Sequence, residues 1–354
     1  MGHRKRTWPL QPSTHTAAPL QVPGTPQQSS PQHLGTSPVK MANMSNLYRD
    51  PRSIIATHHD TYPYISPSKF TGSLNGKVIL LTGAGRGIGR ASALAFAAAG
   101  ANVACVSRTH SDTLSLVHEI SQKGHPRAIA IAADVADADA PGRVVGEVQG
   151  ELGPVDVLVN NAGISRISDV EHEHGMGAAM EVVEVNVRGA LNFIHAVVPS
   201  MIQRKRGVII NVVSVLATIS LPYFSAYSAA KAALVRSTHI MDLEFRPHGI
   251  YSYAVHPCMS RDTSLGEGAL NSEAHEKVEG VKRFMEDFVP SMTDTVQLPA
   301  NTFVALAADP DAKYMSGKYI DSTQDLGMVL EEARKGSGSR IEREGLYILK
   351  VDTL

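Results

Sequence analysis

Cysteine is almost absent from this chain of 354 residues, which contains only Cys105 and Cys258. Two cysteines cannot form a disulfide framework or a four-thiolate zinc site, so we expect the protein to fold in a reducing compartment. Net charge is nearly absent too, because 33 Lys and Arg residues stand against 34 Asp and Glu residues. A general nucleic-acid binder would carry a basic excess, so we expect no nucleic-acid partner.

Hydrophobic runs long and pure enough to cross a membrane are also missing. Residues 207–230 are uncharged but are interrupted by polar residues such as Asn211 and by Pro222. Residues 91–107 are uncharged but contain Gly100 and Asn102. Both stretches fit buried segments of a core better than a lipid-facing span, so we expect no membrane association.

Acidic residues are absent before Asp50, and seven prolines fall within the first 40 residues, among many Gln, Ser and Thr. Such a composition buries too little apolar surface to offset the entropy of the chain. We therefore predict a disordered leader over residues 1–45 and an approach segment over residues 46–72. A cytoplasmic location is favoured, while the acid-poor start leaves organellar targeting open.

Short apolar runs rich in Val, Ile and Ala alternate with helix-like stretches from residue 75 onward. Several runs are continuously apolar, which is typical of parallel strands covered on both faces. Strands are predicted over residues 78–82, 102–106, 128–132, 155–159, 208–213, 251–255 and 318–320. Helices are predicted over residues 88–99, 112–123, 142–152, 178–203, 226–246 and 300–307. The alternation predicts a single α/β domain with a doubly wound, seven-stranded parallel sheet, which is Rossmann-like.

A glycine-rich turn joins the first predicted strand to the first helix, with the sequence Thr82-Gly-Ala-Gly-Arg-Gly-Ile-Gly89. Backbone N–H groups and the helix N-terminus of such a turn bind the pyrophosphate of a dinucleotide. Gly83 would make the tight turn, Gly87 would allow close backbone approach, and Gly89 would allow close helix packing. Arg86 and Ile88 lie in the same turn.

The second predicted strand ends in Val106-Ser107-Arg108, without a carboxylate. An acidic residue at this place binds the 2′-hydroxyl of NAD, whereas an arginine accommodates the 2′-phosphate of NADP. Arg108, with Arg86 beside it, therefore favours NADP(H) as the cofactor, and NAD is the less favoured alternative.

Five motifs in this order resemble the short-chain dehydrogenase/reductase family, over roughly residues 73–325. They are the glycine turn, Asp134-Val135, Asn160-Asn-Ala-Gly163, Asn186, and Ser214 with Tyr227-Ser-Ala-Ala-Lys231. The resemblance implies an NADP(H)-dependent oxidoreductase acting on CH–OH or C=O groups, with hydride transfer at nicotinamide C4. The alternatives are a 3-oxoacyl-thioester ketoreductase and a non-catalytic NADP-binding sensor. A tailoring step in secondary metabolism is a further expectation from the resemblance.

Tyr227 and Lys231 are four residues apart and would share one face of a helix. A neighbouring ammonium and an oxidised nicotinamide would lower the pKa of the phenol, so that Tyr227 can exchange a proton with the substrate oxygen. The Ser214 hydroxyl would stabilise charge on the same oxygen. The resemblance implies that Lys231 also holds the nicotinamide ribose and that Asn186 anchors a water leading to Lys231.

Further cofactor contacts follow from the resemblance. Asp134 and Val135 would border the adenine, and Asn161, Ala162 and Gly163 would line the ribose and nicotinamide. Arg188, Ser260 and Thr263 are weaker candidates, and Tyr227 and Lys231 are counted with the cofactor contacts. The match departs from the family at His256-Pro257-Cys258, because a glycine usually follows the proline. Cys258 would be tolerated with a negative φ, and it would also narrow the pocket.

The family domain is predicted over residues 73–330, with a lid at about 260–292 and a charged C-terminal tail over 331–354. The apolar stretch Val278, Val281, Phe284, Met285 and Phe288 suggests an apolar or aromatic carbonyl substrate, although a helix packed on the core would have the same pattern. No metal site is expected, in spite of the cluster Glu171-His-Glu-His174. A homodimer or homotetramer is expected by resemblance.

Overall fold

Seven parallel strands form one sheet in the computed structural model, which describes residues 53–169, 171, 176–260, 262–263 and 276–350. The strands are β1 (Val78–Thr82), β2 (Asn102–Ser107), β3 (Ala128–Ala132), β4 (Val157–Asn160), β5 (Gly207–Val212), β6 (Ile250–His256) and β7 (Tyr319–Asp321). Their order is β3-β2-β1-β4-β5-β6-β7. The predicted doubly wound sheet is confirmed. Its winding reverses between β1 and β4, where such sheets bind their ligands.

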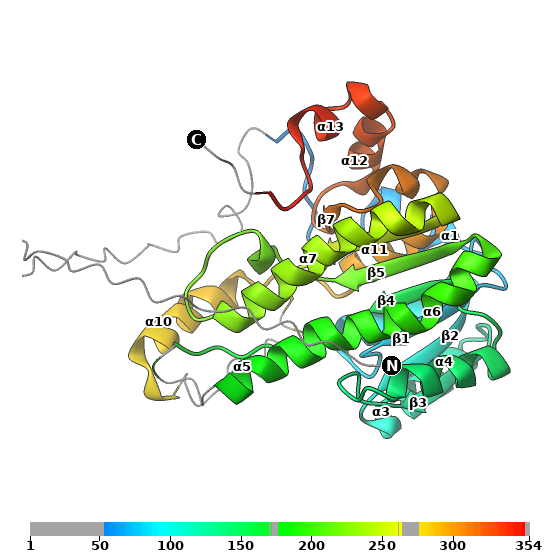
Figure 1. Ribbon diagram of the computed structural model, residues 1–354, viewed down its shortest axis with the longest axis horizontal. Helices are drawn as coiled ribbons and strands as arrows, with labels where there is room; N and C mark the ends of the chain where they lie inside the picture. The colour runs from blue at the N-terminus through cyan, green and yellow to red at the C-terminus, as the bar shows by residue number, and fades with distance from the viewer. Residues whose placement is uncertain (1–52, 170, 172–175, 261, 264–275, 351–354) are drawn as a thin grey trace, which may run out of the picture. The chain divides into compact units, whose positions relative to one another are not determined.

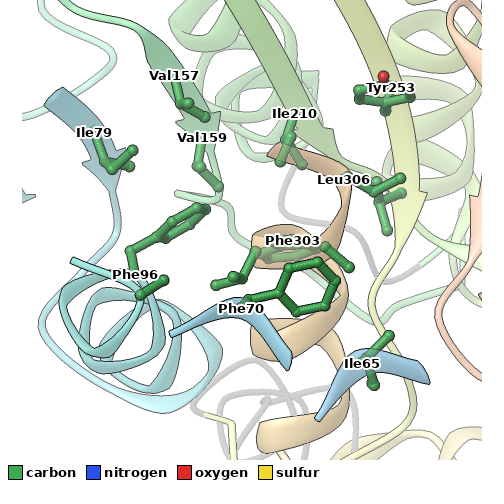
Figure 2. Packing of buried hydrophobic residues seen from close by; sticks show 14 of the residues in the cluster. Ile65, Phe70, Ile79, Phe96, Val157, Val159, Ile210, Tyr253, Phe303 and Leu306 are labelled. Carbon is green, nitrogen blue, oxygen red and sulfur yellow. The ribbon is translucent and has the colours of Figure 1, made fainter. Parts of the chain in front are cut away.

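Strands β1 and β4 are buried throughout, as their continuous apolar sequences predict, whereas the edge strand β3 is only partly buried and its Ala132 is exposed. Alternate residues of β1 serve opposite faces, because side chains along a strand alternate. Ile79 and Leu81 join a cluster with helices α2 (Gly87–Ala98), α3 (His110–Gln122) and α11 (Gln297–Ala308), part of which is shown in Figure 2. Val78 and Leu80 join a second cluster with α4 (Ala140–Glu151) and α6 (Ala190–Arg204). Two layers of helices therefore enclose the sheet.

The predicted helix over 178–203 is built from three pieces. These are α5 (Met176–Val183), a π-helical turn over Glu184–Gly189, and α6. Asn186 lies inside the π turn, where the chain holds an extra residue per turn. The next long helix is α7 (Ser225–Phe245), which packs against α5 and β6. Figure 1 shows α10 (Glu279–Phe288) close to α5 and to the start of α7, on the side toward which β5 points.

The segments flanking the predicted domain also contribute to its core. Before β1, the short helices Pro63–Ile65 and α1 (Pro67–Phe70) bury Ile65 and Phe70 (Figure 2). After β7, α12 (Leu326–Ala333) crosses the predicted boundary at residue 330, and α13 (Arg340–Glu344) buries Ile341. The described residues up to 350 therefore continue to pack on the domain beyond the predicted boundary. The apolar Ile341 anchors them to the core despite their many charges.

Other expectations fall outside the described residues. These are the leader over 1–45, residues 261 and 264–275 of the predicted lid, and His172, Glu173 and His174. Among the residues that the structure does describe, no helix is both long and apolar enough to cross a membrane.

Candidate active site

A cavity of about 360 Å³ lies at the carboxyl ends of the strands. Its walls come from the segments that follow β1 to β6, so residues far apart in sequence converge there. Of the eighteen predicted site residues, all but Asn186 and Arg188 line it. The sixteen that line it are Gly83, Arg86, Gly87, Ile88, Gly89, Arg108, Asp134, Val135, Asn161, Ala162, Gly163, Ser214, Tyr227, Lys231, Ser260 and Thr263.

The glycine turn is packed too tightly for side chains. A Cβ atom on Gly89 would lie 2.0 Å from the Gly83 carbonyl oxygen, and one on Gly83 would lie 2.9 Å from the Ala162 Cα. Gly83 and Gly87 also have φ values of +67° and +52°, which glycine adopts without strain. The turn therefore offers bare backbone at the N-terminus of α2, the arrangement that accepts a pyrophosphate.

The far end of the cavity has a mixed charge that the sequence did not reveal. Arg86 and Arg108 are both exposed there. Asp112, in the first turn of α3, lines the same part of the cavity. Its Oδ2 would be 3.3 Å from a Cβ on Gly85, so a carboxylate does border the glycine turn. Sequence reasoning missed Asp112 because it looked for the acid at the end of β2 and not inside the next helix.

Tyr227, Ser214 and Lys231 meet at the other end of the cavity. All three are buried, with exposed fractions of 6%, 9% and 3%. Ser214 follows β5 and its Oγ accepts a hydrogen bond from the Leu216 N–H at 3.2 Å. The Lys231 ammonium donates to the Val212 carbonyl at 2.8 Å and lies 5.6 Å from the centre of the Tyr227 ring. The helical spacing of Tyr227 and Lys231 thus brings phenol and ammonium together.

Burial shifts the two titrating groups in opposite directions. It raises the pKa of Tyr227 to about 12, although a hydrogen bond with the Ser214 hydroxyl lowers this pKa in part. It lowers the pKa of Lys231 to about 8 because the ammonium loses hydration. At neutral pH the phenol therefore keeps its proton, and most of Lys231 is charged. A protonated phenol beside an ammonium is suited to act as a proton donor.

Asn186 lies behind the cavity and not in its wall. Its amide nitrogen donates to the carbonyls of Ile164 at 2.7 Å and Val182 at 2.9 Å, and its Oδ1 accepts from the Ile164 N–H at 3.3 Å. A Cβ on Gly163 would lie 2.6 Å from this Oδ1 and 3.5 Å from the Lys231 Nζ. The side chain of Asn186 therefore holds the loop that passes Lys231.

Arg188 also lies away from the cavity. Its guanidinium forms an ion pair with Glu184 and donates to the Ala136 carbonyl at 3.0 Å. These contacts explain its place on the outer side of the π turn.

The loop after β6 closes the cavity from above the glycine turn. A Cβ on Gly87 would lie 3.1 Å from the Asp262 carbonyl oxygen, so this loop lies against the turn. Cys258 lines the cavity with φ of 159°, close to fully extended backbone, so the negative φ named as the condition for a cysteine here is not what the chain adopts. The loop is held from behind by Asp294, whose Oδ2 accepts from the Met259 N–H at 2.8 Å.

A β-bridge joins the loop after β6 to the chain that follows α10. Ser260 pairs with Thr293 in an antiparallel β-bridge. The other oxygen of Asp294 contacts the Nδ1 of His59 at 2.6 Å, which ties this part of the chain to the segment before β1. Sequence reasoning missed Asp294 and His59, because no motif connects residues 235 positions apart.

Apolar residues of α10 pack over this part of the molecule. Val281, Phe284, Met285 and Phe288 are all buried, and Phe224 contacts both Phe284 and Phe288. The helix therefore packs on the core, and Phe288 and the following Met292 also reach the cavity. Within the described ranges, no group of three or more His, Cys, Asp or Glu residues is arranged to hold a metal ion.

Comparison with known proteins supports one family. A family model described as short chain dehydrogenase matches residues 77–273. A short chain dehydrogenase of Pseudocercospora fijiensis is 40% identical over 300 residues, which cover 84% of this chain and 96% of that protein. A 3-oxoacyl-acyl-carrier-protein reductase of Staphylococcus epidermidis is 36% identical over 253 residues, which cover 69% of this chain and 96% of that protein.

The solved structures agree with the sequence relatives. A crystal structure of a protein described as a short-chain alcohol dehydrogenase from Sinorhizobium meliloti matches with a TM-score of 0.61 at 28% identity, over 73% of this chain and 97% of that one. The seven-stranded parallel sheet flanked by helices agrees with this structural match. The chain belongs to the short-chain dehydrogenase/reductase family of oxidoreductases, which bind a nicotinamide cofactor.

Proposed function

We propose that this protein is an NADPH-dependent reductase that converts a ketone into a secondary alcohol, with Tyr227 as the proton donor. One observation carries the proposal: Tyr227, Ser214 and Lys231 converge at one end of a cavity whose other end is the glycine turn. A reacting carbonyl placed beside Tyr227 would be within the same cavity as a dinucleotide held on that turn. Bound NADPH supplies the hydride that the carbonyl carbon accepts.

The cradle at the glycine turn fits a dinucleotide, because side chains are excluded where the pyrophosphate would approach. We assign the pyrophosphate to Gly83, Gly87, Gly89 and the N-terminus of α2. Arg86 and Arg108 would contact the 2′-phosphate, and this supports NADP(H) over NAD. Asp134 and Val135, Asn161 to Gly163, and Ser260 and Thr263 are assigned to the adenine, the ribose and the nicotinamide by their positions along the cavity.

Ser214 and Tyr227 would hold the substrate oxygen together. The Ser214 Oγ accepts from the Leu216 N–H, so its own proton would shift from the Tyr227 oxygen to the substrate oxygen when substrate binds. Tyr227 transfers its proton to the substrate oxygen as negative charge develops there. The Lys231 ammonium stabilises the phenolate that remains. Because the pKa of Tyr227 is raised to about 12, the phenol carries its proton at neutral pH, and this supports the reductive direction.

Asn186 has a positioning role in this proposal. Its side-chain amide already donates to the carbonyls of Ile164 and Val182, so other atoms would have to bind the predicted water. Asn186 instead keeps the loop at Gly163 beside Lys231.

The test of this function is NADPH oxidation, followed at its near-ultraviolet absorbance, with a panel of ketones. Tyr227→Phe removes the proton donor and should lower the turnover number by a factor on the order of 10² to 10⁴, the usual contribution of a positioned acid. NADPH binding, measured by the change in its fluorescence, should stay close to wild type. Wild-type turnover by Tyr227→Phe would contradict the assignment.

Two alternatives give different results in the same experiment. A 3-oxoacyl-thioester ketoreductase, the activity named for the Staphylococcus epidermidis relative, would prefer acetoacetyl-CoA to simple ketones. A non-catalytic sensor would bind NADPH and oxidise none. We further propose a cytoplasmic homo-oligomer with a role in secondary metabolism, which light scattering and localisation of the tagged full chain can test.

A further inference from the structure

The end of the cavity beyond Tyr227 is apolar and rich in aromatic and thioether groups. Phe224 and Phe288 lie there, with ring centres 6.0 Å apart, together with Met259 and Met292. Several aliphatic side chains complete this end of the cavity, namely Ile164, Ile167, Leu216, Ile219 and Leu221. Aromatic rings and methionine sulfur both contact aromatic ligands favourably. This composition fits a flat, apolar substrate.

Charge is confined to other parts of the cavity wall. The charged residues of the described lining are Arg86, Arg108, Asp112 and Asp134 around the cofactor end, and Lys231. Lys231 already donates to the Val212 carbonyl, beside the reacting position. Among the described residues, the apolar end therefore holds no cation that could pair with a phosphate or a carboxylate of the substrate. A neutral substrate fits this end better than a phosphate-bearing thioester.

One polar atom interrupts the apolar end. Ser165 lines the cavity between Ile164 and Ile167, and its Oγ is buried without a hydrogen-bond partner among the described residues. A buried hydroxyl left unpaired is destabilising, so such groups are normally paired. Binding sites typically combine an apolar wall with a few polar groups that fix the ligand's orientation. A ligand oxygen at Ser165 would pair the buried hydroxyl and would also fix the ligand's orientation.

We propose that Ser165 is a substrate-binding residue, which recognises a second oxygen atom on a neutral aromatic ketone whose reacting carbonyl lies at Tyr227. This proposal rests on the proposed reductase function and adds the class of its substrate. The second oxygen is a phenol or another hydroxyl, because the Ser165 hydroxyl can both donate and accept a hydrogen bond. The rings of Phe224 and Phe288 pack against the aromatic part of the ligand.

Ser168 provides a matched control on the same loop. Its Oγ is also buried without a hydrogen-bond partner among the described residues, but Ser168 does not line the cavity. The experiment compares wild type, Ser165→Ala and Ser168→Ala in the full chain. The substrates are α-tetralone, its ring-hydroxylated isomers, the saturated ketone decalone and acetoacetyl-CoA, each with NADPH.

We expect wild type to favour at least one hydroxylated tetralone over α-tetralone and decalone. Ser165→Ala should lower kcat/KM for that isomer about tenfold, equivalent to a neutral hydrogen bond of about 1.4 kcal/mol. It should leave kcat/KM for α-tetralone within about twofold, and Ser168→Ala should leave both values unchanged. Ser165→Thr, which keeps the hydroxyl, should retain the preference for the hydroxylated isomer.

Equal losses for both tetralones in Ser165→Ala would overturn the role of Ser165, as would the same pattern in Ser168→Ala. A clear preference for decalone or acetoacetyl-CoA would overturn the aromatic substrate class and leave the reductase function intact. NADPH binding without reduction of any compound would overturn the reductase function and this proposal together.

Discussion

Asp294 offers a sharp test of how the loop after β6, which lines the cavity, is held in place. Its side chain is 4% exposed, and its two oxygens accept from the Met259 N–H at 2.8 Å and contact His59 at 2.6 Å. Asp294→Ala removes both interactions and leaves the Met259 N–H without its acceptor. The hydrogen bond from the Met259 N–H to a charged group contributes about 1.5–3 kcal/mol, and the half-exposed His59 adds less than about 1 kcal/mol, so we expect a loss of about 3 kcal/mol in the free energy of unfolding.

Two companion variants separate the parts of this loss. Asp294→Asn keeps one carbonyl oxygen for the Met259 N–H and should lose about 2 kcal/mol. His59→Ala should lose less than about 1 kcal/mol, because the side chain of His59 is 52% exposed and water screens its charge. The three values come from urea unfolding followed by circular dichroism and extrapolated to water. The KM for NADPH should rise most in Asp294→Ala, less in Asp294→Asn and least in His59→Ala. This order is expected because Asp294 holds Met259, and Met259 and Ser260 line the cavity.

If Asp294→Ala loses stability but keeps the wild-type KM for NADPH, the proposed link between Asp294 and cofactor binding through the loop at Met259 and Ser260 is refuted. A loss below about 1 kcal/mol for Asp294→Ala would refute the hydrogen-bond argument itself. If His59→Ala costs as much as Asp294→Ala, the Met259 N–H is not the main partner.

Three other parts of the site give independent predictions. Arg108→Asp should raise the KM for NADPH by at least about tenfold and change the KM for NADH little. Asp112→Asn should lower the KM for NADPH, because it removes a negative charge near the 2′-phosphate. Both variants are measured by steady-state kinetics. The reductive kcat/KM should be constant at lower pH and fall above pH about 8, since Lys231 has a pKa of about 8 and loses the charge that stabilises the phenolate; a flat profile to pH 10 would count against this role. Gly89→Ala should abolish dinucleotide binding in a fluorescence titration, because its Cβ would lie 2.0 Å from the Gly83 oxygen, while Gly146→Ala, with no heavy atom within 4 Å of its added Cβ, should bind normally.

Local spacing explains what could be predicted from sequence. The continuous apolar runs predicted the strands because the central strands are covered on both faces, although the edge strand β3 is only partly buried. The glycine turn and the spacing of Tyr227 and Lys231 are local patterns, and the structure brings the residues of both into the cavity wall. A helical period does not distinguish an α-helix from a π turn over so few residues, so the turn around Asn186 was not predicted.

Long-range packing explains what could not be predicted. Asp112 lies in a helix, and only the packing of α3 against the glycine turn brings its carboxylate to the cavity. The charged residues after 330 suggested a tail, because one buried Ile341 is a weak signal in a polar sequence. No motif distinguishes Ser165 from other loop serines, and only the fold places it among apolar residues of the cavity wall.

The bridge between Ser260 and Thr293 makes the intervening segment an exchangeable unit. Its two ends are pinned together beside the cofactor loop, so changes in between need not move that loop. Lengthening a closed loop adds little entropic cost, about 0.6 kcal/mol for each doubling. Changes over residues 276–292, which include the cavity-lining Phe288 and Met292, can therefore alter the cavity wall while Ser214 and Tyr227 stay fixed. Grafting this segment between fungal relatives would be a direct way to move substrate preference from one enzyme to another.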